Sequence, residues 1–263
     1  MKLKNKVVIV TGAGSGMGRE LALELVRRGA KVVALDMHSA SVEETAHLAG
    51  SAVTALVLDV TDRVAVAALP ARIEALVGPA DVLINNAGII QPFVPINELT
   101  IEQAEKVMNV NFYGPFAMVK AFLPMLLKRP EAHILNVSSM GAYAPVPGQS
   151  VYGASKAAVK LFTEGLRSEL RETNVGVTIV FPGAVATNIT TNSGIDLPEV
   201  SADASSFKQT SAQVAAKMMV DAIEKGKPRI TIGKDAAMMD RLSRINPVFA
   251  ANLIYKQMKS LLG

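Results

Sequence analysis

The sequence predicts a single-domain, doubly wound α/β fold, in which one parallel sheet is covered by helices on both faces. Short runs rich in Val, Ile and Leu alternate along the chain with longer amphipathic stretches, and several of the short runs are apolar at consecutive positions. Strands buried on both faces show this continuous pattern, and helical connections between them make neighbouring strands parallel. A chain of 263 residues with 50% hydrophobic content is long enough for one such core.

Seven short runs are predicted to be the strands. They are, in order, "KVVIVTG", "KVVALD", "AVTALVLDV", "DVLINNAG", "AHILNVSS", "GVTIVFPG" and "RITIG". Residues 188–210 form one long stretch rich in Thr, Ser, Asn and Ala, which we expect to be a substrate lid because loops of that length in compact domains are usually functional. Residues 1–233 carry the strand and helix pattern, and residues 234–263 are predicted to add an amphipathic helical extension that Pro247 divides in two.

The composition excludes several classes of site. Cysteine is absent, which excludes disulfides, thiolate catalysis and cysteine-ligated metals, and the three histidines show no metal-ligand spacing. We therefore expect no metal. The apolar runs are too short for a signal peptide or a bilayer-spanning helix, which favours a cytoplasmic protein.

The positive charge is concentrated near the C-terminus. The segment from Lys227 onward has seven Lys or Arg and two Asp or Glu, a net charge of +5, and the first 226 residues carry −1. A nucleic-acid binder is expected to show a basic stripe with interleaved aromatic residues, and the main body has none. We expect no nucleic-acid partner.

A glycine-rich turn, "TGAGSGMG", follows the first predicted strand. Gly12, Gly16 and Gly18 precede or open a helix there, where backbone amides and a helix N-terminus can hold a pyrophosphate. The spacing is G-x-x-x-G-x-G, and Met17 stands where the general dinucleotide motif would have its third glycine. We expect this turn, with Ser15 and Met17, to bind a dinucleotide.

Asp36 closes the second predicted strand, about 20 residues after the glycine turn, where a carboxylate can accept both hydroxyls of an adenosine ribose. The same charge repels a 2′-phosphate, and Ser15, Met37 and His38 offer no compensating positive charge. The sequence therefore favours NAD over NADP. Further cofactor contacts are expected at the ends of the third and fourth strands, from Asp59, Val60, Asn86, Ala87 and Gly88.

The stretch "SVYGASK" places Tyr152 and Lys156 four residues apart. On a helix both lie on one face, so the ammonium can stabilise a phenolate and lower the phenol pKa from its usual value of ~10. Tyr255 and Lys259 have the same spacing, but only the first pair follows a predicted strand that ends in a serine, Ser139, thirteen residues upstream. We therefore predict a catalytic role for the first pair alone.

Together these motifs resemble the short-chain dehydrogenase/reductase family, and the resemblance covers roughly residues 4–233. The matching stretches are "TGAGSGMG", "NNAG", "NVNFYG", the Ser139, Tyr152 and Lys156 set, and "PGAVAT". The resemblance implies a Rossmann-type fold, an NAD(P)-dependent oxidoreductase, and Asn111 as a fourth catalytic residue that holds a water in a proton relay through Lys156. It also implies that Lys156 binds the nicotinamide ribose, and that Pro182, Gly183 and Thr187 bind the carboxamide, with Val185 beside them.

Apolar residues after the fourth and fifth strands predict an apolar substrate pocket. They are Ile89, Ile90, Pro92, Phe93, Val94, Met140, Tyr143 and Val146. With Ser139, Gln149 and Tyr152 as polar contacts, we expect a small hydrophobic secondary alcohol to be interconverted with its ketone, Tyr152 acting as general acid/base. Two alternatives stay open: an NADPH-dependent 3-oxoacyl thioester reductase whose Lys128 and Arg129 meet an acidic carrier protein, and a dinucleotide-sensing protein without turnover.

The C-terminal extension has an apolar face beside four basic residues, Arg241, Arg244, Lys256 and Lys259. We expect it to cover the substrate pocket or a subunit neighbour in a homodimer or homotetramer. A cationic amphipathic helix can also lie on an anionic membrane surface, and a plain core helix is the third interpretation.

Overall fold

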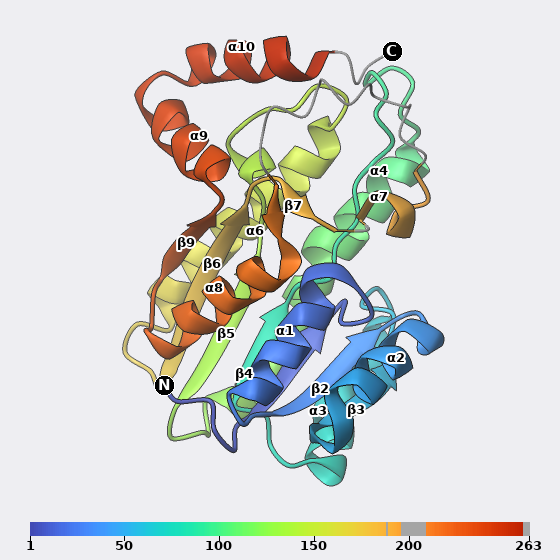
Figure 1. Ribbon diagram of the computed structural model, residues 1–263, viewed down its shortest axis with the longest axis vertical. Coiled ribbons are helices and arrows are strands. Elements are labelled where there is room, and N and C mark those ends of the chain that lie inside the picture. Colours follow the sequence, from blue (N-terminus) through green and yellow to red (C-terminus); the bar gives the residue numbers. More distant parts are fainter. Residues whose placement is uncertain (188, 196–208, 260–263) are drawn as a thin grey trace.

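The computed structural model describes residues 1–187, 189–195 and 209–259, and its centre is one seven-stranded parallel sheet (Figure 1). The strand order is β3-β2-β1-β4-β5-β6-β9, and every neighbouring pair is parallel. All seven predicted strands lie in it, which confirms the predicted fold class. Their bounds are β1 Val7–Thr11, β2 Lys31–Asp36, β3 Val53–Val57, β4 Val82–Asn85, β5 Ala132–Val137, β6 Val175–Pro182 and β9 Arg229–Ile232.

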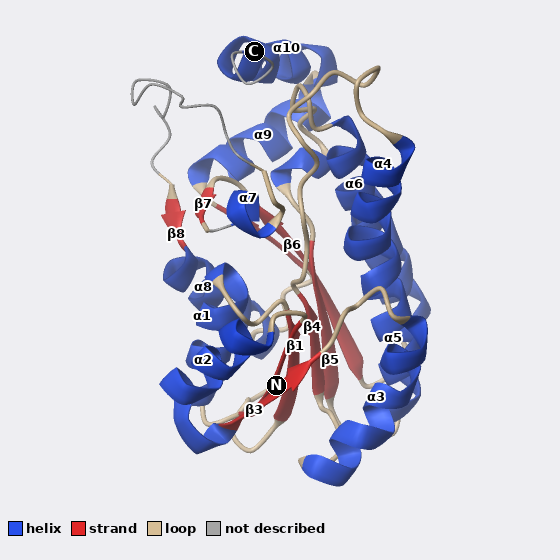
Figure 2. Cartoon of the chain, turned by 90° about the vertical axis from the view of Figure 1, so that its right-hand side faces the viewer, coloured by secondary structure: helices blue, strands red, loops and turns tan. Residues whose placement is uncertain are grey.

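Helices cover both faces of the sheet (Figure 2). One face carries α1 (Gly16–Arg27), α2 (Ser39–Ala49) and α8 (Ala212–Glu224). The other carries α3 (Arg63–Leu76), α5 (Gly114–Leu126) and α6 (Ser150–Glu169), with α4 (Ile101–Met108) beside α6. Short helical turns, η1 (Gly50–Ala52), η2 (Asn109–Tyr113) and η3 (Met140–Ala142), connect some of these elements.

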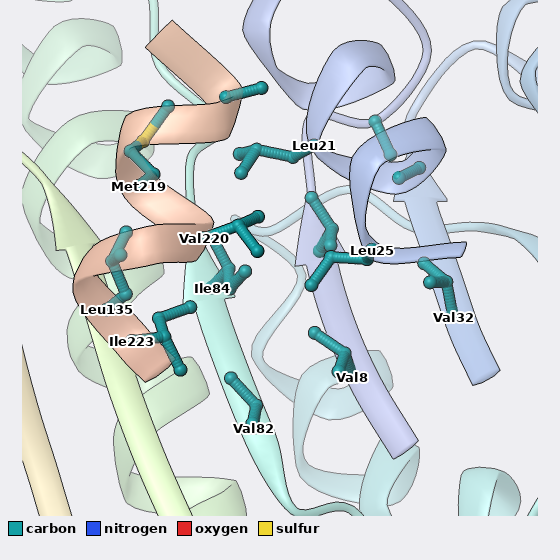
Figure 3. Packing of buried hydrophobic residues seen from close by; sticks show 14 of the residues in the cluster. Val8, Leu21, Leu25, Val32, Val82, Ile84, Leu135, Met219, Val220 and Ile223 are labelled. Carbon is teal, nitrogen blue, oxygen red and sulfur yellow. The ribbon is translucent and has the colours of Figure 1, made fainter. Parts of the chain in front are cut away.

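The continuous apolar strands are explained by the two hydrophobic layers that the sheet separates. Val8 of β1 packs with Leu21 and Leu25 of α1 and with Val220 of α8 (Figure 3), whereas its neighbour Ile9 packs in the opposite layer. Successive strand residues point to opposite faces of a sheet, so a strand buried on both faces needs apolar residues at every position.

The strand order reverses between β1 and β4. After β1 the chain continues to β2 on one side, and after β3 it crosses back to β4 on the other side of β1. Ligands of open α/β sheets bind beyond the carboxyl ends of the strands at such a reversal. The predicted site residues follow β1, β4, β5 and β6 at that edge.

The remaining elements lie above the carboxyl edge of the sheet. They are β7 (Val185–Ala186), α7 (Ile189–Asn192), β8 (Thr210–Ser211), α9 (Lys234–Ile245) and α10 (Pro247–Met258). The helical extension is therefore divided at Pro247, as the sequence predicts. Ala250 and Ile254 of α10 pack with Met239 of α9 against Ala144, in the segment between β5 and α6. None of the helices in the described part of the chain combines the length and the apolar composition needed to cross a bilayer.

Candidate active site

The glycine-rich turn forms a close backbone contact between β1 and α1. Gly12 and Gly16 have φ of +66° and +51°, a region that glycine adopts without strain. A Cβ atom on Gly18 would overlap the carbonyl oxygen of Gly12, so only glycine lets the helix approach the turn this closely. The first amides of α1 lack partners within the helix and face this turn, which fits a pyrophosphate-binding site.

The carboxylate of Asp36 lies directly against the glycine turn. Its Oδ2 accepts a hydrogen bond of 2.9 Å from Gly14 N–H, and its Oδ1 accepts one of 3.1 Å from His38 N–H. A cation that the sequence pattern does not single out, Arg19, lies beside the turn, and its guanidinium donates to Gly14 O and to Glu44. The carboxylate therefore lies at the end of β2 and close to the turn, as a ribose-binding residue would.

Asp59 and Val60, which are predicted to contact the cofactor, lie just after β3. The exposed Asp59 accepts hydrogen bonds of 2.8 Å from both Thr61 N–H and Thr61 Oγ1. Val60 is buried and lies close to Gly114, where a Cβ atom would come within 3.0 Å of it. The structure places Asp59 and Val60 at the same edge of the sheet as Asp36.

The loop after β4 is fastened to the end of β1. Thr11 Oγ1 accepts hydrogen bonds from the backbone N–H groups of Asn86 (3.0 Å) and Ala87 (3.1 Å), and Asn86 Nδ2 donates to Thr11 O. The buried Oδ1 of Asn86 has no partner among the described residues. A Cβ atom on Gly88 would lie 3.0 Å from Lys156 Nζ. The unpaired Asn86 acceptor fits a bound cofactor, and the closeness of Gly88 to Lys156 leaves no room for a side chain at that position.

Ser139, Tyr152 and Lys156 come together at the end of β5. The Ser139 hydroxyl accepts a hydrogen bond of 3.0 Å from Gly141 N–H. Burial raises the pKa of the Tyr152 phenol, and the neighbouring Ser139 hydroxyl lowers it by less. Lys156 Nζ lies 5.9 Å from the centre of the Tyr152 ring and donates to Val137 O at 3.2 Å. Burial lowers the pKa of Lys156 to about 8, so it is mostly protonated at neutral pH.

Asn111 is fully buried in η2, a single π-helical turn between α4 and α5. Its Oδ1 accepts from Ile89 N–H and its Nδ2 donates to Ile89 O, both at 2.9 Å. Nδ2 also donates to Ser155 Oγ at 3.0 Å, and that hydroxyl donates to Tyr152 O at 2.7 Å. Asn111 is thus linked to the Tyr152 backbone, and the water relay through Lys156 stays a prediction.

The residues after β6 lie close to the glycine turn. Pro182 ends β6 and Val185 begins β7. A Cβ atom on Gly16 would lie 3.3 Å from the Thr187 side chain, so this segment passes over the turn. Asp235 of α9 accepts a hydrogen bond of 2.7 Å from Ala184 N–H. Asp235 was missed by the sequence analysis, and the one signal was an acidic residue in the first turn of a predicted helix.

The described part of the predicted lid bridges two binding loops. Asn192 Nδ2 donates to Ser15 Oγ at 2.7 Å, and Ser193 Oγ accepts from Ile90 N–H at 3.0 Å. Residues 188 and 196–208 of the lid lie outside the described residues. The role of this segment as a substrate lid stays a prediction.

A pocket of about 410 Å³ lies between the segment after β5 and the start of α6. Gln149 and Tyr152 line it, and its other walls include Ala142, Tyr143, Pro145, Val146, Ala154 and Ala157. Tyr143 Oη donates to Ala236 O at 2.9 Å, which fastens α9 to this wall. A second pocket of about 480 Å³ is lined by His133 and other residues at the amino-terminal edge, far from the predicted catalytic residues.

Comparison with known proteins identifies the family. The model of the short chain dehydrogenase family matches residues 6–197. The chain belongs to the short-chain dehydrogenase/reductase family. The oxidoreductase SadH of Mycobacterium tuberculosis is 36% identical over 252 residues, which cover 92% of this chain and 91% of that protein.

Solved structures of short-chain dehydrogenases show the same fold. One from Burkholderia phymatum in complex with NAD has a TM-score of 0.85 and 27% identity, covering 95% of this chain and 96% of that one. One from Burkholderia cenocepacia in complex with NADP has a TM-score of 0.81 and 28% identity, covering 97% and 99%. This short-chain dehydrogenase/reductase is therefore an NAD(P)-dependent oxidoreductase with a nicotinamide dinucleotide cofactor.

Proposed function

We propose that this enzyme interconverts a small hydrophobic secondary alcohol and its ketone, with NAD as the preferred cofactor and Tyr152 as general acid/base. One observation carries the proposal. The Ser139, Tyr152 and Lys156 side chains converge at the carboxyl edge of the sheet, and Tyr152 also lines a pocket whose other walls are mainly apolar. A phenol held beside an apolar pocket can exchange a proton with a substrate that has one hydroxyl on a hydrocarbon body.

The proton chemistry follows from the three side chains. In oxidation Tyr152, as phenolate, takes the proton of the substrate hydroxyl, and in reduction Tyr152 returns it to the carbonyl oxygen. Ser139 donates a hydrogen bond that fixes the substrate oxygen, and the positive charge of Lys156 favours the phenolate. A bound nicotinamide would supply the hydride acceptor or donor for the substrate carbon. General acid–base catalysis of this kind contributes ~10²- to 10⁴-fold.

The cofactor contacts in this proposal are those that the sequence predicts. The glycine turn with Ser15 and Met17 would hold the pyrophosphate, Asp36 the adenosine ribose, and Asn86, Gly88 and Lys156 the nicotinamide side. The preference for NAD rests on the Asp36 carboxylate, which would repel a 2′-phosphate beside Gly14. Arg19, the nearby cation, is already bonded to Gly14 O and Glu44.

The residues proposed to dock a carrier protein in the thioester reductase alternative lie away from Tyr152. Arg129 donates to Asp81 at 2.9 Å, and Asp81 in turn accepts from Val7 N–H at the start of β1. Lys128 and Arg129 therefore lie at the amino-terminal edge of the sheet, opposite Tyr152. A carrier protein docked on these two residues would lie at the edge of the sheet away from Tyr152 of the same chain, which does not support this alternative.

The helical extension is proposed to cover the substrate pocket. Tyr143 lines the pocket and bonds α9 through Ala236 O, and α10 packs on Ala144 beside it. The opposite side of the extension leaves Val248 and Phe249 exposed, at 69% and 55%. That exposed face supports a second role as a contact between subunits of a homodimer or homotetramer.

The test is a panel of hydrophobic secondary alcohols, ketones and 3-oxoacyl thioesters, assayed with the oxidised and reduced forms of NAD and NADP by the absorbance of the reduced nicotinamide. Turnover with NAD that disappears in Tyr152→Phe supports the proposal. Turnover confined to acyl thioesters, or to NADPH, would replace it with the reductase alternative. Binding of NAD without turnover of any member would favour the dinucleotide-sensing alternative.

A further inference from the structure

Gln91 is a buried glutamine, 1% exposed, in the loop after β4. Its side chain lies against the first turn of α6, although sixty residues separate the two in the sequence. The Gln91 Oε1 accepts hydrogen bonds from Val151 N–H (2.8 Å) and Tyr152 N–H (2.9 Å), and its Nε2 donates to Gly148 O (2.8 Å). Both polar atoms of its side chain form hydrogen bonds with the segment that carries Tyr152.

These contacts supply a cap that α6 does not supply itself. The first amides of a helix have no intrahelical partner, and a short polar side chain just before the helix usually accepts from them. Gln149 occupies that position, but its side chain makes no such bond and donates instead to Gln91 O at 2.7 Å. Gln91 therefore caps the helix from another part of the chain.

The cap fixes the backbone of Tyr152 at one end, and a second contact fixes it at the other. Tyr152 O accepts a hydrogen bond of 2.7 Å from Ser155 Oγ, which accepts one of 3.0 Å from Asn111 Nδ2. Asn111 also bonds both backbone groups of Ile89, two residues before Gln91. The contacts form a closed ring that runs from Asn111 through Ile89, Gln91, Tyr152 and Ser155.

We propose that Gln91 is a positioning residue for the reaction, holding Tyr152 in register with Ser139 and with the loop after β4. This inference rests on the proposed function, because it assigns Tyr152 the proton transfer. Gln91 does not touch the reacting atoms. It acts by limiting the displacement of α6, since a misplacement of about 1 Å in a reacting group can cost about 10²-fold in rate.

The kinetic test compares two substitutions of Gln91 with a matched control. Gln91→Met keeps the length and removes every hydrogen bond of the side chain, whereas Gln91→Glu keeps an oxygen acceptor at the helix N-terminus. Gln103→Met removes a glutamine that bonds Thr100 in the capping box of α4 and makes no bond to α6. With an alcohol from the panel, we expect Gln91→Met to lower kcat about 10- to 100-fold with KM for NAD within about twofold. Gln91→Glu keeps the acceptor for the Val151 and Tyr152 amides but loses the donor to Gly148 O, so it should recover part of that loss. Gln103→Met should retain wild-type kcat.

Two further measurements need no substrate. Amide hydrogen exchange should become faster at Val151 and Tyr152 in Gln91→Met, while Gly153, whose N–H bonds Gln149 O, stays protected. Tyrosine labelled at Cζ reports the pKa of Tyr152 by NMR, with Tyr152→Phe as the assignment. Lys156 is the charged group that faces the ring and favours the phenolate, whereas a carboxylate in Gln91→Glu opposes it and should raise the pKa by about half a unit or more.

The outcomes separate this inference from the proposed function. If no member of the panel turns over, the proposed function fails, and exchange and the Tyr152 pKa still decide whether Gln91 holds the residue. Unchanged amide exchange in Gln91→Met, or an equal loss of kcat in Gln103→Met, would overturn the positioning role.

Discussion

Lys156 Nζ lies 5.9 Å from the centre of the Tyr152 ring, and both side chains leave the same face of α6. A hydrogen bond of 3.2 Å to Val137 O ties the ammonium to the end of β5. The second pair with this spacing belongs to α10 and its C-cap, where Tyr255 is 53% exposed. Identical spacing therefore produces a half-buried tyrosine and a buried lysine at the carboxyl edge of the sheet in one place, and a surface pair in the other.

The first prediction is that Tyr152→Phe lowers turnover by at least ~10²-fold, because the ring stays and the acid/base hydroxyl is lost. Binding of NADH, followed by its fluorescence, should stay within about twofold of wild type. Tyr255→Phe is the matched control and should leave turnover nearly unchanged. Near-wild-type turnover in Tyr152→Phe would remove Tyr152 from the mechanism.

The second prediction is that Asp36→Ala shifts the ratio of the two specificity constants toward NADP. The substitution removes the proposed ribose hydrogen bonds of NAD and the repulsion of a 2′-phosphate, and leaves Arg19 nearby. Measuring kcat/KM for both cofactors at several ionic strengths separates the repulsive part, which salt screens at a partly exposed charge. A wild-type preference for NADP would contradict the assignment of Asp36.

The third prediction concerns the free energy of unfolding of the protein without cofactor, which the burial of Lys156 lowers. Burial lowers the pKa of Lys156 to about 8 from 10.5, so between those pH values the folded state binds fewer protons than the unfolded state. Wild-type stability then rises with pH in that window. Lys156→Met should be more stable than wild type by up to about 3 kcal/mol at pH 7, with the difference vanishing near pH 10.5.

Urea unfolding at pH 7 and at pH 10 measures this difference. The control is Lys160→Met, which lies on the same helix and loses only a partly exposed ion pair with Glu164. Its stability should change by less than about 1 kcal/mol at either pH. If the stabilities of Lys156→Met and Lys160→Met differ from wild type in the same way at both pH values, the burial of Lys156 is not the cause of the pH dependence.

The fourth prediction concerns the helical extension. Deleting residues 246–263 removes α10 from Ala144, so we expect weaker substrate binding or a lower oligomeric mass with unchanged NAD binding. Analytical ultracentrifugation and cofactor titration measure the two. Strong co-sedimentation of the full chain with anionic liposomes, lost in the deletion, would favour the membrane interpretation instead. A truncated protein that fails to fold would make α10 a plain core helix.

The sequence was sufficient to predict the strands of the sheet. Strands buried on both faces need apolar residues at consecutive positions, so all seven strands could be found without knowing their neighbours. The sequence also located the glycine turn, which is defined by the spacing of a few neighbouring residues. It located Asp36 as well, because this residue ends a predicted strand. These features depend on residues that are close in the sequence, so the sequence alone can predict them.

Contacts between distant segments were decided only by the tertiary structure. Gln91 caps α6 by bonding Val151, sixty residues later in the chain. Asp235 accepts a hydrogen bond from Ala184, fifty-one residues earlier in the chain. Lys128 and Arg129 are as basic as any carrier-binding pair, yet the fold places them at the opposite edge from Tyr152. A hydrogen bond depends on positions in space, and residues far apart in the chain acquire those positions only when the sheet and its helices pack together.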